Sequence, residues 1–322
     1  MKIDDERRLS ADRNSGRIVL LVLVWFLLSG RSLSAQSKLQ ASDKVEVKDT
    51  HFHLTNYDQQ GPDIHTFLNL MDTKVGSVAL FAIPLQQEWS YHTSGEFAPT
   101  NDLHSDAPLY YYSFTDAFIP VVYRSLSKAG QARFDPMITG FNSADRDGVD
   151  HIRRVLLTFA GVFSGIGEFT VHKEFVAPKV AGETASLQNP ALDRTLDFAA
   201  DVGFMALIHN DLDVPFAKNG AEPAHLSQMT SLLNRHPKTI IWAHTGMGRV
   251  VRPVGHHAST IEAILRDPQC RHVYFGISLE EVAKYLLAGP EATTISADLI
   301  NHTLISFSLA RMKSHPQPEN ST

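Results

Sequence analysis

The chain has 322 residues, of which 43% are hydrophobic and 20% are charged, so it can bury the core of one barrel of about 250 residues. A net charge of -6 offers no broad basic surface for phosphates, which argues against nucleic acid and leaves a small molecule as the expected partner. Sixteen histidines and a single cysteine, Cys270, exclude a disulfide framework and a thiolate zinc site, leaving imidazoles and carboxylates as metal ligands.

In chain order, the first predicted element is a signal peptide over residues 1–35. Basic residues up to Arg17 precede the apolar run Ile18 to Leu28, and small residues follow up to Ala35. A helix needs about 20 apolar residues to span a bilayer, so this run is too short to anchor the chain. We therefore expect cleavage near Ala35, no stable membrane span and a secreted or periplasmic location, with twin-arginine export through Arg7 and Arg8 as an alternative route.

From residue 40 onwards, short apolar runs alternate with longer helical stretches, which is typical of β-α units around a parallel sheet. The expected strands are Val45–Val47, Ser77–Ile83, Pro136–Phe141, Phe163–Phe169, Phe204–Ile208, Thr239–Ala243 and His272–Ile277. The expected helices include Asp147–Phe159, Pro190–Val202 with Asn189 as its N-cap, and Ala224–Arg235. The sequence thus predicts an α/β protein, with a TIM-like (β/α)8 barrel over residues 36–301 that lacks its eighth strand.

A long connection runs from Gln86 to Asp116 and is rich in tyrosine. We expect it to be an irregular insertion on the face where the strands end, and a candidate lid. Its Trp89, together with Tyr91 and the run Tyr110 to Tyr112, could line an apolar pocket for substrate. Ordinary packing of the loop is the alternative for these tyrosines.

Two histidines stand two residues apart in the segment Asp49-Thr50-His51-Phe52-His53. In extended backbone, alternate residues point to the same side, so His51 and His53 could bind one cation together. Chance spacing in a histidine-rich chain is the alternative for the pair taken alone.

Polar residues also come at the ends of three later strands. Glu168, His209 and His244 each follow apolar or small residues of the fourth, fifth and sixth expected strands. Polar residues that repeatedly close strands at one end are typical of a barrel active site. Any one of them taken singly could equally be a satisfied core residue or part of a structural salt bridge.

These segments resemble the amidohydrolase superfamily, in particular its branch of lactone hydrolases and decarboxylases of unsaturated acids. The resemblance covers about residues 45–301 and rests on Asp49–Leu54, Gly167-Glu168, Ile208-His209-Asn210 and Trp242-Ala243-His244-Thr245-Gly246. It implies that His51, His53 and His209 are metal ligands, that Glu168 is a further ligand or a hydrogen-bond partner, and that His244 is a catalytic residue that polarises or protonates the reacting group. A homodimer is expected from the resemblance alone.

The predicted function is metal-dependent hydrolysis of an ester, lactone or amide in a small molecule. A divalent cation, with zinc as the first choice, would activate water and polarise the carbonyl; manganese, cobalt and iron would accept the same ligands. Arg249 and Arg252 follow the sixth strand and could hold a substrate carboxylate, although surface salt bridges are the alternative for both. Non-hydrolytic decarboxylation is the alternative reaction, and a catalytically impaired binding homologue is the alternative outside the enzymes.

The end of the chain departs from the family pattern. Residues 302–322 contain no apolar strand and no aspartate, whereas the family carries a catalytic aspartate at the end of the eighth strand. The neighbouring reading frame can encode Phe-Leu-Phe-Gly-Thr-Asp, which suggests a frameshift near Asn301; a divergent tail is the alternative. Gly276 and Leu279 also stand where the family usually has aspartate and tryptophan.

Overall fold

The computed structural model describes residues 47–96, 105–173, 175–183, 185–214, 218, 221–244, 257–276, 287 and 289–302. The chain divides into the units Met1–Glu46 and Val47–Thr322, and every described residue belongs to the second unit. The predicted signal peptide therefore lies outside the described residues, as does the predicted aberrant tail apart from its first residue. None of the helices in the described part combines the length and the apolar character needed to cross a membrane.

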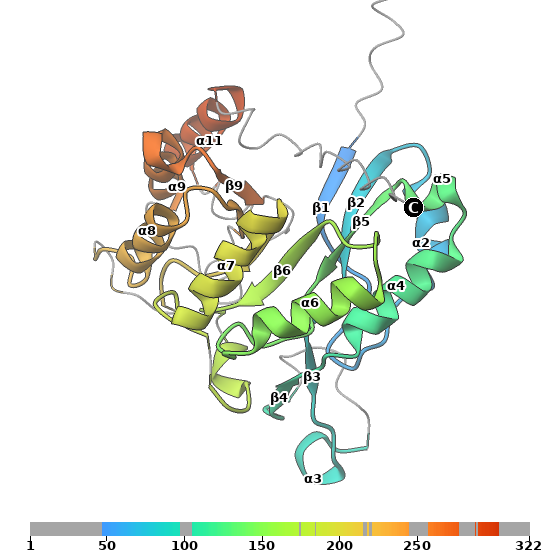
Figure 1. Ribbon diagram of the computed structural model, residues 1–322. Coiled ribbons are helices and arrows are strands. Elements are labelled where there is room, and N and C mark those ends of the chain that lie inside the picture. The colour runs from blue at the N-terminus through green and yellow to red at the C-terminus, as the bar shows by residue number, and fades with distance from the viewer. Residues whose placement is uncertain are drawn as a thin grey trace, which may run out of the picture. The chain divides into compact units, whose positions relative to one another are not determined.

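Seven parallel strands form the central sheet, in the order β1-β2-β5-β6-β7-β8-β9 (Figure 1). Their bounds are β1 Val47–His53, β2 Val75–Phe81, β5 Phe134–Ile138, β6 Gly165–Thr170, β7 Met205–His209, β8 Ile240–His244 and β9 Val273–Gly276. Each strand pairs with the one that precedes it in this sheet, which is the succession that the β-α units of a barrel produce. The α/β class and the seven strands of a partial (β/α) barrel are thus confirmed. The described residues contain no strand that follows β9 in this sheet, where the eighth strand of a barrel would lie.

The first strand was placed too early by the apolar pattern, at Val45–Val47. β1 instead runs to His53, because the backbone from Val47 onwards pairs with β2 through the polar residues that follow. The metal-ligand candidates His51 and His53 therefore lie within the strand itself.

Helices supply the layer that covers the sheet (Figure 1). They are α2 Ile64–Met71, α4 Thr115–Ser125, α5 Lys128–Gln131, α6 Gly148–Thr158, α7 Pro190–Val202, α8 Leu226–Arg235, α9 His257–Arg266 and α11 Pro290–His302, with short 3-10 turns at Ala177–Lys179 and Pro268–Cys270. α7 has the predicted bounds, and the side chain of Asn189 accepts a hydrogen bond from the Ala191 N–H at 2.9 Å, as an N-cap does. α7 ends at Gly203, whose left-handed φ of 71° suits glycine.

Both faces of the sheet are buried. In β2, Val78 and Leu80 belong to the large core beneath the helices, whereas the alternate residues Ala79 and Phe81 belong to a smaller apolar cluster with residues of β5 and β7. Strands buried on both sides are the rule in parallel sheets, and they leave the strand ends as the place where polar side chains can gather.

The long insertion is more regular than predicted. β3 (Leu85–Gln87) and β4 (Leu109–Tyr111) pair in an antiparallel two-stranded sheet, and α3 (Tyr91–Ser94) follows β3. Leu85 and Leu109 bury their side chains in a small apolar cluster with Tyr57, Ile83, Val176 and Val180, which gives these short strands their stability.

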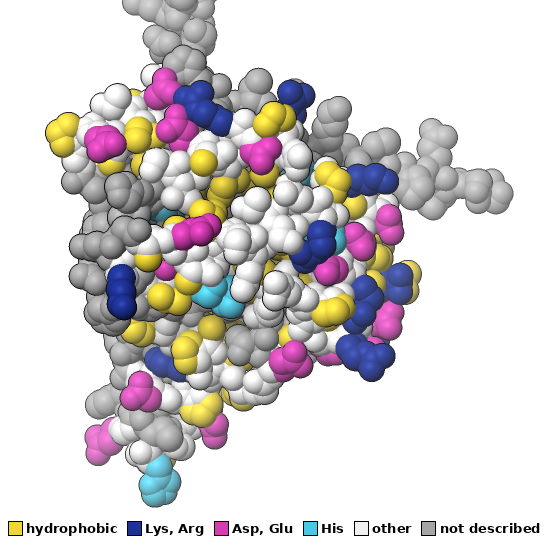
Figure 2. Space-filling model, turned by 90° about the vertical axis from the view of Figure 1, so that its left-hand side faces the viewer, with side chains coloured by type: hydrophobic (Ala, Val, Ile, Leu, Met, Phe, Trp, Pro, Cys, Tyr) yellow, Lys and Arg dark blue, Asp and Glu magenta, His cyan; other side chains and the backbone are white. Residues whose placement is uncertain are grey.

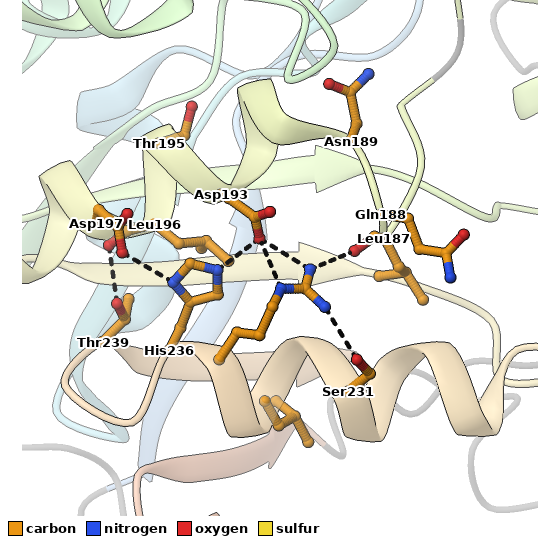
Figure 3. A network of polar contacts seen from close by, with 12 residues as sticks. Leu187, Gln188, Asn189, Asp193, Thr195, Leu196, Asp197, Ser231, His236 and Thr239 are labelled. Atoms are coloured by element: carbon orange, nitrogen blue, oxygen red, sulfur yellow. Dashed lines mark hydrogen bonds and ion pairs between the residues drawn. The ribbon is translucent and has the colours of Figure 1, made fainter.

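A polar network joins α7 to α8 (Figure 3). The buried His236 ring contacts Asp193 Oδ1 through Nε2 at 2.7 Å and Asp197 Oδ1 through Nδ1 at 3.0 Å. Arg235 donates from Nη2 to Asp193 Oδ1 at 2.8 Å and to the Leu187 carbonyl at 2.9 Å. Burial raises the pKa of Asp193, but hydrogen bonds from His236 and Arg235 outweigh it and hold that pKa below its ordinary value.

We expect Asp193→Asn to lower the free energy of unfolding by about 1–3 kcal/mol at neutral pH, because it weakens the hydrogen bonds that the charged Arg235 guanidinium donates to this carboxylate. Because the folded-state pKa is depressed, this contribution is complete above the ordinary carboxyl pKa of about 3.9 and is lost as the pH falls through the lower folded value. Urea unfolding at neutral and acidic pH measures both effects. Asp197→Asn is the matched control: the Asp197 side chain is 71% exposed, and its loss should cost less than about 1 kcal/mol.

Candidate metal centre

The two histidines of β1 point to the same side of the strand. Their Nε2 atoms lie 3.0 Å apart, and both rings meet Phe81 of β2 edge-on, at centroid distances of 5.2 Å for His51 and 4.6 Å for His53. The His51 side chain is 5% exposed and that of His53 is 20% exposed. The pair therefore presents two imidazole nitrogens to one small volume at the edge of the core.

Glu168 of β6 brings a carboxylate to the same place. Its side chain is 2% exposed, and Oε2 lies 2.8 Å from His53 Nε2 and 3.5 Å from His51 Nε2. In the described part of the chain, these three residues form the one group whose ligand atoms all lie within 4.8 Å of one another and could hold a metal ion.

Glycine precedes this carboxylate for a steric reason. Gly167 has φ of 111°, and a Cβ at this position would lie 2.2 Å from the Leu207 carbonyl oxygen on the neighbouring strand β7. Only a residue without a side chain allows the two backbones to approach so closely. Gly167 thus fixes the strand geometry that carries Glu168.

The other oxygen of Glu168 faces a different set of groups. Oε1 forms a hydrogen bond with Nδ1 of His209, the last residue of β7, and lies 3.7 Å from Lys173 Nζ. The second ring nitrogen of His209, Nε2, lies 3.6 Å from Asp211 Oδ1. His209 was predicted to be a metal ligand, and the structure places it beside Glu168 with a carboxylate near each ring nitrogen, outside the three-residue group.

Glu168 and His53 have the protonation states that favour binding of a cation. Burial opposes the charge of Glu168, but the positive charge of Lys173, followed by His209 and His51, holds its pKa well below the ordinary value. Burial lowers the pKa of His53 to about 4 despite the neighbouring carboxylate. Near neutral pH the site therefore offers an anionic carboxylate oxygen next to a neutral imidazole, which are the forms that bind metal.

Of the other predicted site residues, the structure describes Trp89 and the backbone of His244. His244 is the last residue of β8, and its backbone pairs with Gly276 of β9, so it ends its strand as His209 does; its side chain is outside the described part. Arg249 and Arg252 also lie outside the described residues. Trp89 is 43% exposed and packs against Tyr91 at a centroid distance of 5.5 Å, so its contact with substrate stays a prediction.

Sequence reasoning missed two charged residues of the site, Lys173 and Asp211. Each is buried and follows a strand that carries a site residue, Lys173 after β6 and Asp211 after β7. Their signal in the sequence is a charge just beyond an apolar strand, a pattern shared by many solvent-exposed loop residues.

A further pair, His172 and His225, stacks ring on ring at 3.8 Å, and burial lowers the pKa of His172 to about 4.

Basic and acidic side chains are interspersed over the face shown in Figure 2, where histidine atoms reach the surface near the centre. The described residues on that face form no continuous area of one charge.

No protein-family model and no curated protein matches the sequence. Among solved structures, the chain is similar to a dihydroorotase from Campylobacter jejuni, with 12% identity and a TM-score of 0.44 over 81% of this chain and 67% of that one. It is also similar to a probable 2-pyrone-4,6-dicarboxylic acid hydrolase from Acinetobacter baumannii, with 11% identity and a TM-score of 0.41 over 80% of each chain. At these values neither likeness establishes a family for the chain.

Proposed function

We propose that this chain is a metal-dependent hydrolase of the amidohydrolase type, acting on an ester, lactone or amide bond of a small molecule. The observation that carries the proposal is the convergence of His51 Nε2, His53 Nε2 and Glu168 Oε2 from two strands that are not neighbours in the sheet. Two imidazole nitrogens and one carboxylate oxygen are a donor set that zinc accepts, and manganese, cobalt and iron accept it too.

Each residue of the site has a part in this proposal. His51, His53 and Glu168 would hold the ion, and His209 and Lys173 orient the carboxylate through its other oxygen. When bound, a divalent cation supplies Lewis acidity toward water and toward a carbonyl group. His244 ends β8 at the same edge of the sheet where His209 ends β7, which suits a residue that exchanges a proton with the reacting group.

The substrate side of the proposal rests on the sequence. Arg249 and Arg252 would bind a substrate carboxylate, and Trp89 would cover an apolar part of the molecule. Such a substrate would be met in a secreted or periplasmic location, which we propose from the signal-like segment 1–35.

Metal restoration tests this function. The chain is stripped with a chelator, divided, and reloaded with Zn²⁺, Mn²⁺ or Co²⁺, and each portion is assayed on a panel of esters, lactones and amides. At a metal concentration about 100 times the Kd, binding should stabilise the fold by about 2.7 kcal/mol and raise the Tm by roughly 5 °C or more. Hydrolysis should appear only in reloaded portions.

Two results would contradict the proposal. If no metal raises the Tm, the metal centre is wrong. If metal binds but no carbonyl substrate is hydrolysed, the chain is not a hydrolase; release of CO2 from an unsaturated acid would then identify a decarboxylase.

A further inference from the structure

The two oxygens of Glu168 face different surroundings, and Lys173 lies beside one of them, Oε1. Oε2 lies within 3.5 Å of the Nε2 atoms of both His51 and His53. Oε1 meets His209 Nδ1 and lies 3.7 Å from Lys173 Nζ. The carboxylate therefore has an imidazole-lined side and a side that already carries an ammonium group.

A buried carboxylate of this kind can bridge two metal ions, since paired metal sites hold their ions about 3.5–4 Å apart. A second ion beside Oε1 would need a position close to that oxygen and to a ring nitrogen of His209. The ammonium of Lys173 lies at that oxygen, and its side chain is 6% exposed, so it cannot move its charge into solvent without leaving the core.

Charge also opposes a second ion at this position. In the described part of the cluster, Glu168 and Asp211 supply the carboxylates, and Lys173 already offsets the charge of Glu168. A divalent ion next to Oε1 would stand against a full positive charge in a poorly solvated place, where repulsion is weakly screened.

We propose that Lys173 restricts the site to a single metal ion, by occupying the Oε1 side of Glu168 and leaving only Oε2 for an ion held by His51 and His53. The inference rests on the proposed function, because it assumes that these residues bind a metal. It makes Lys173 a positioning residue that sets the metal count of the site.

Metal counting on the full-length chain tests the inference. The protein is dialysed against buffered Zn²⁺, and bound zinc is measured by inductively coupled plasma mass spectrometry relative to protein. Wild type should bind one ion per chain. Lys173→Glu replaces the ammonium with a further carboxylate and should bind two. Lys173→Met removes the excluding charge and should bind more than one ion per chain at raised free Zn²⁺, whereas Lys173→Arg keeps the charge and should still bind one.

A second readout does not depend on how well the variants fold. Wild-type protein loaded with Mn²⁺ should give the electron paramagnetic resonance spectrum of isolated ions, without the exchange coupling of a bridged pair. A bridged pair in wild type, or one ion in a folded Lys173→Glu chain, overturns the role of Lys173 and leaves the metal centre intact. No bound ion in wild type overturns the metal centre itself, and the inference with it.

Discussion

Glu168→Gln is expected to weaken the binding of a divalent metal by about 100-fold or more, since even partners outside the ligand set change affinity by about 10–100-fold. The amide is neutral and offers a weaker donor beside His51 and His53. The change also removes the carboxylate charge that lies 3.7 Å from the buried Lys173 ammonium, and breaking a buried ion pair by removing one partner typically costs about 3–5 kcal/mol. Isothermal titration with Zn²⁺ and urea unfolding of the metal-free protein measure the two effects.

Glu88→Gln is the matched control, because Glu88 is an exposed residue of the insertion. Metal affinity and stability should be unchanged in that variant. If Glu168→Gln bound zinc as tightly as wild type, the carboxylate would not be a ligand. Should the variant fail to fold, His53→Asn tests zinc binding by the same cluster from its more exposed side, and zinc affinity equal to that of wild type would contradict the metal centre.

Gly167→Ala is expected to destabilise the fold by several kcal/mol and to remove metal binding as well. Its Cβ would stand 2.2 Å from the Leu207 carbonyl oxygen and 2.9 Å from the Leu207 nitrogen, so β6 and β7 would have to move apart. Because Glu168 is the next residue, that movement takes its carboxylate away from His51 and His53. Thermal unfolding with and without Zn²⁺ measures both consequences.

Gly182→Ala separates this steric effect from the general strain of a positive φ. Gly182 has φ of 91°, but a Cβ there would meet nothing within 4 Å. Its replacement should cost about 1 kcal/mol from backbone strain alone and leave metal binding unchanged. Equal losses in the two alanine variants would show that the contact with Leu207 does not position Glu168.

Much of the fold follows from local sequence patterns. Apolar runs located six of the seven strands to within a few residues, and proline after Asn189 located the start of α7. β1 was misplaced because five of the six residues that follow Val47 are polar, and its pairing with β2 is a tertiary contact that hydrophobicity does not report. The strands β3 and β4 were missed because each is only three residues long.

The site was predictable where spacing within one strand decides the geometry. His51 and His53 share a side because the side-chain period of a strand is two residues. The meeting of Glu168 with that pair depends on how β6 lies in the sheet, and the place of Lys173 depends on the path of the chain after β6. For His209 the strand end was predicted correctly, but the sequence could not show that its Nδ1 would face Glu168.

The most direct test of the metal centre is a crystal structure of the chain grown with Zn²⁺, with data collected on both sides of the zinc absorption edge. We predict an anomalous difference peak about 2.0–2.2 Å from His51 Nε2, His53 Nε2 and a Glu168 oxygen. A zinc-bound crystal with no peak there, or with zinc only at other residues, would contradict the assignment of this cluster as the metal centre.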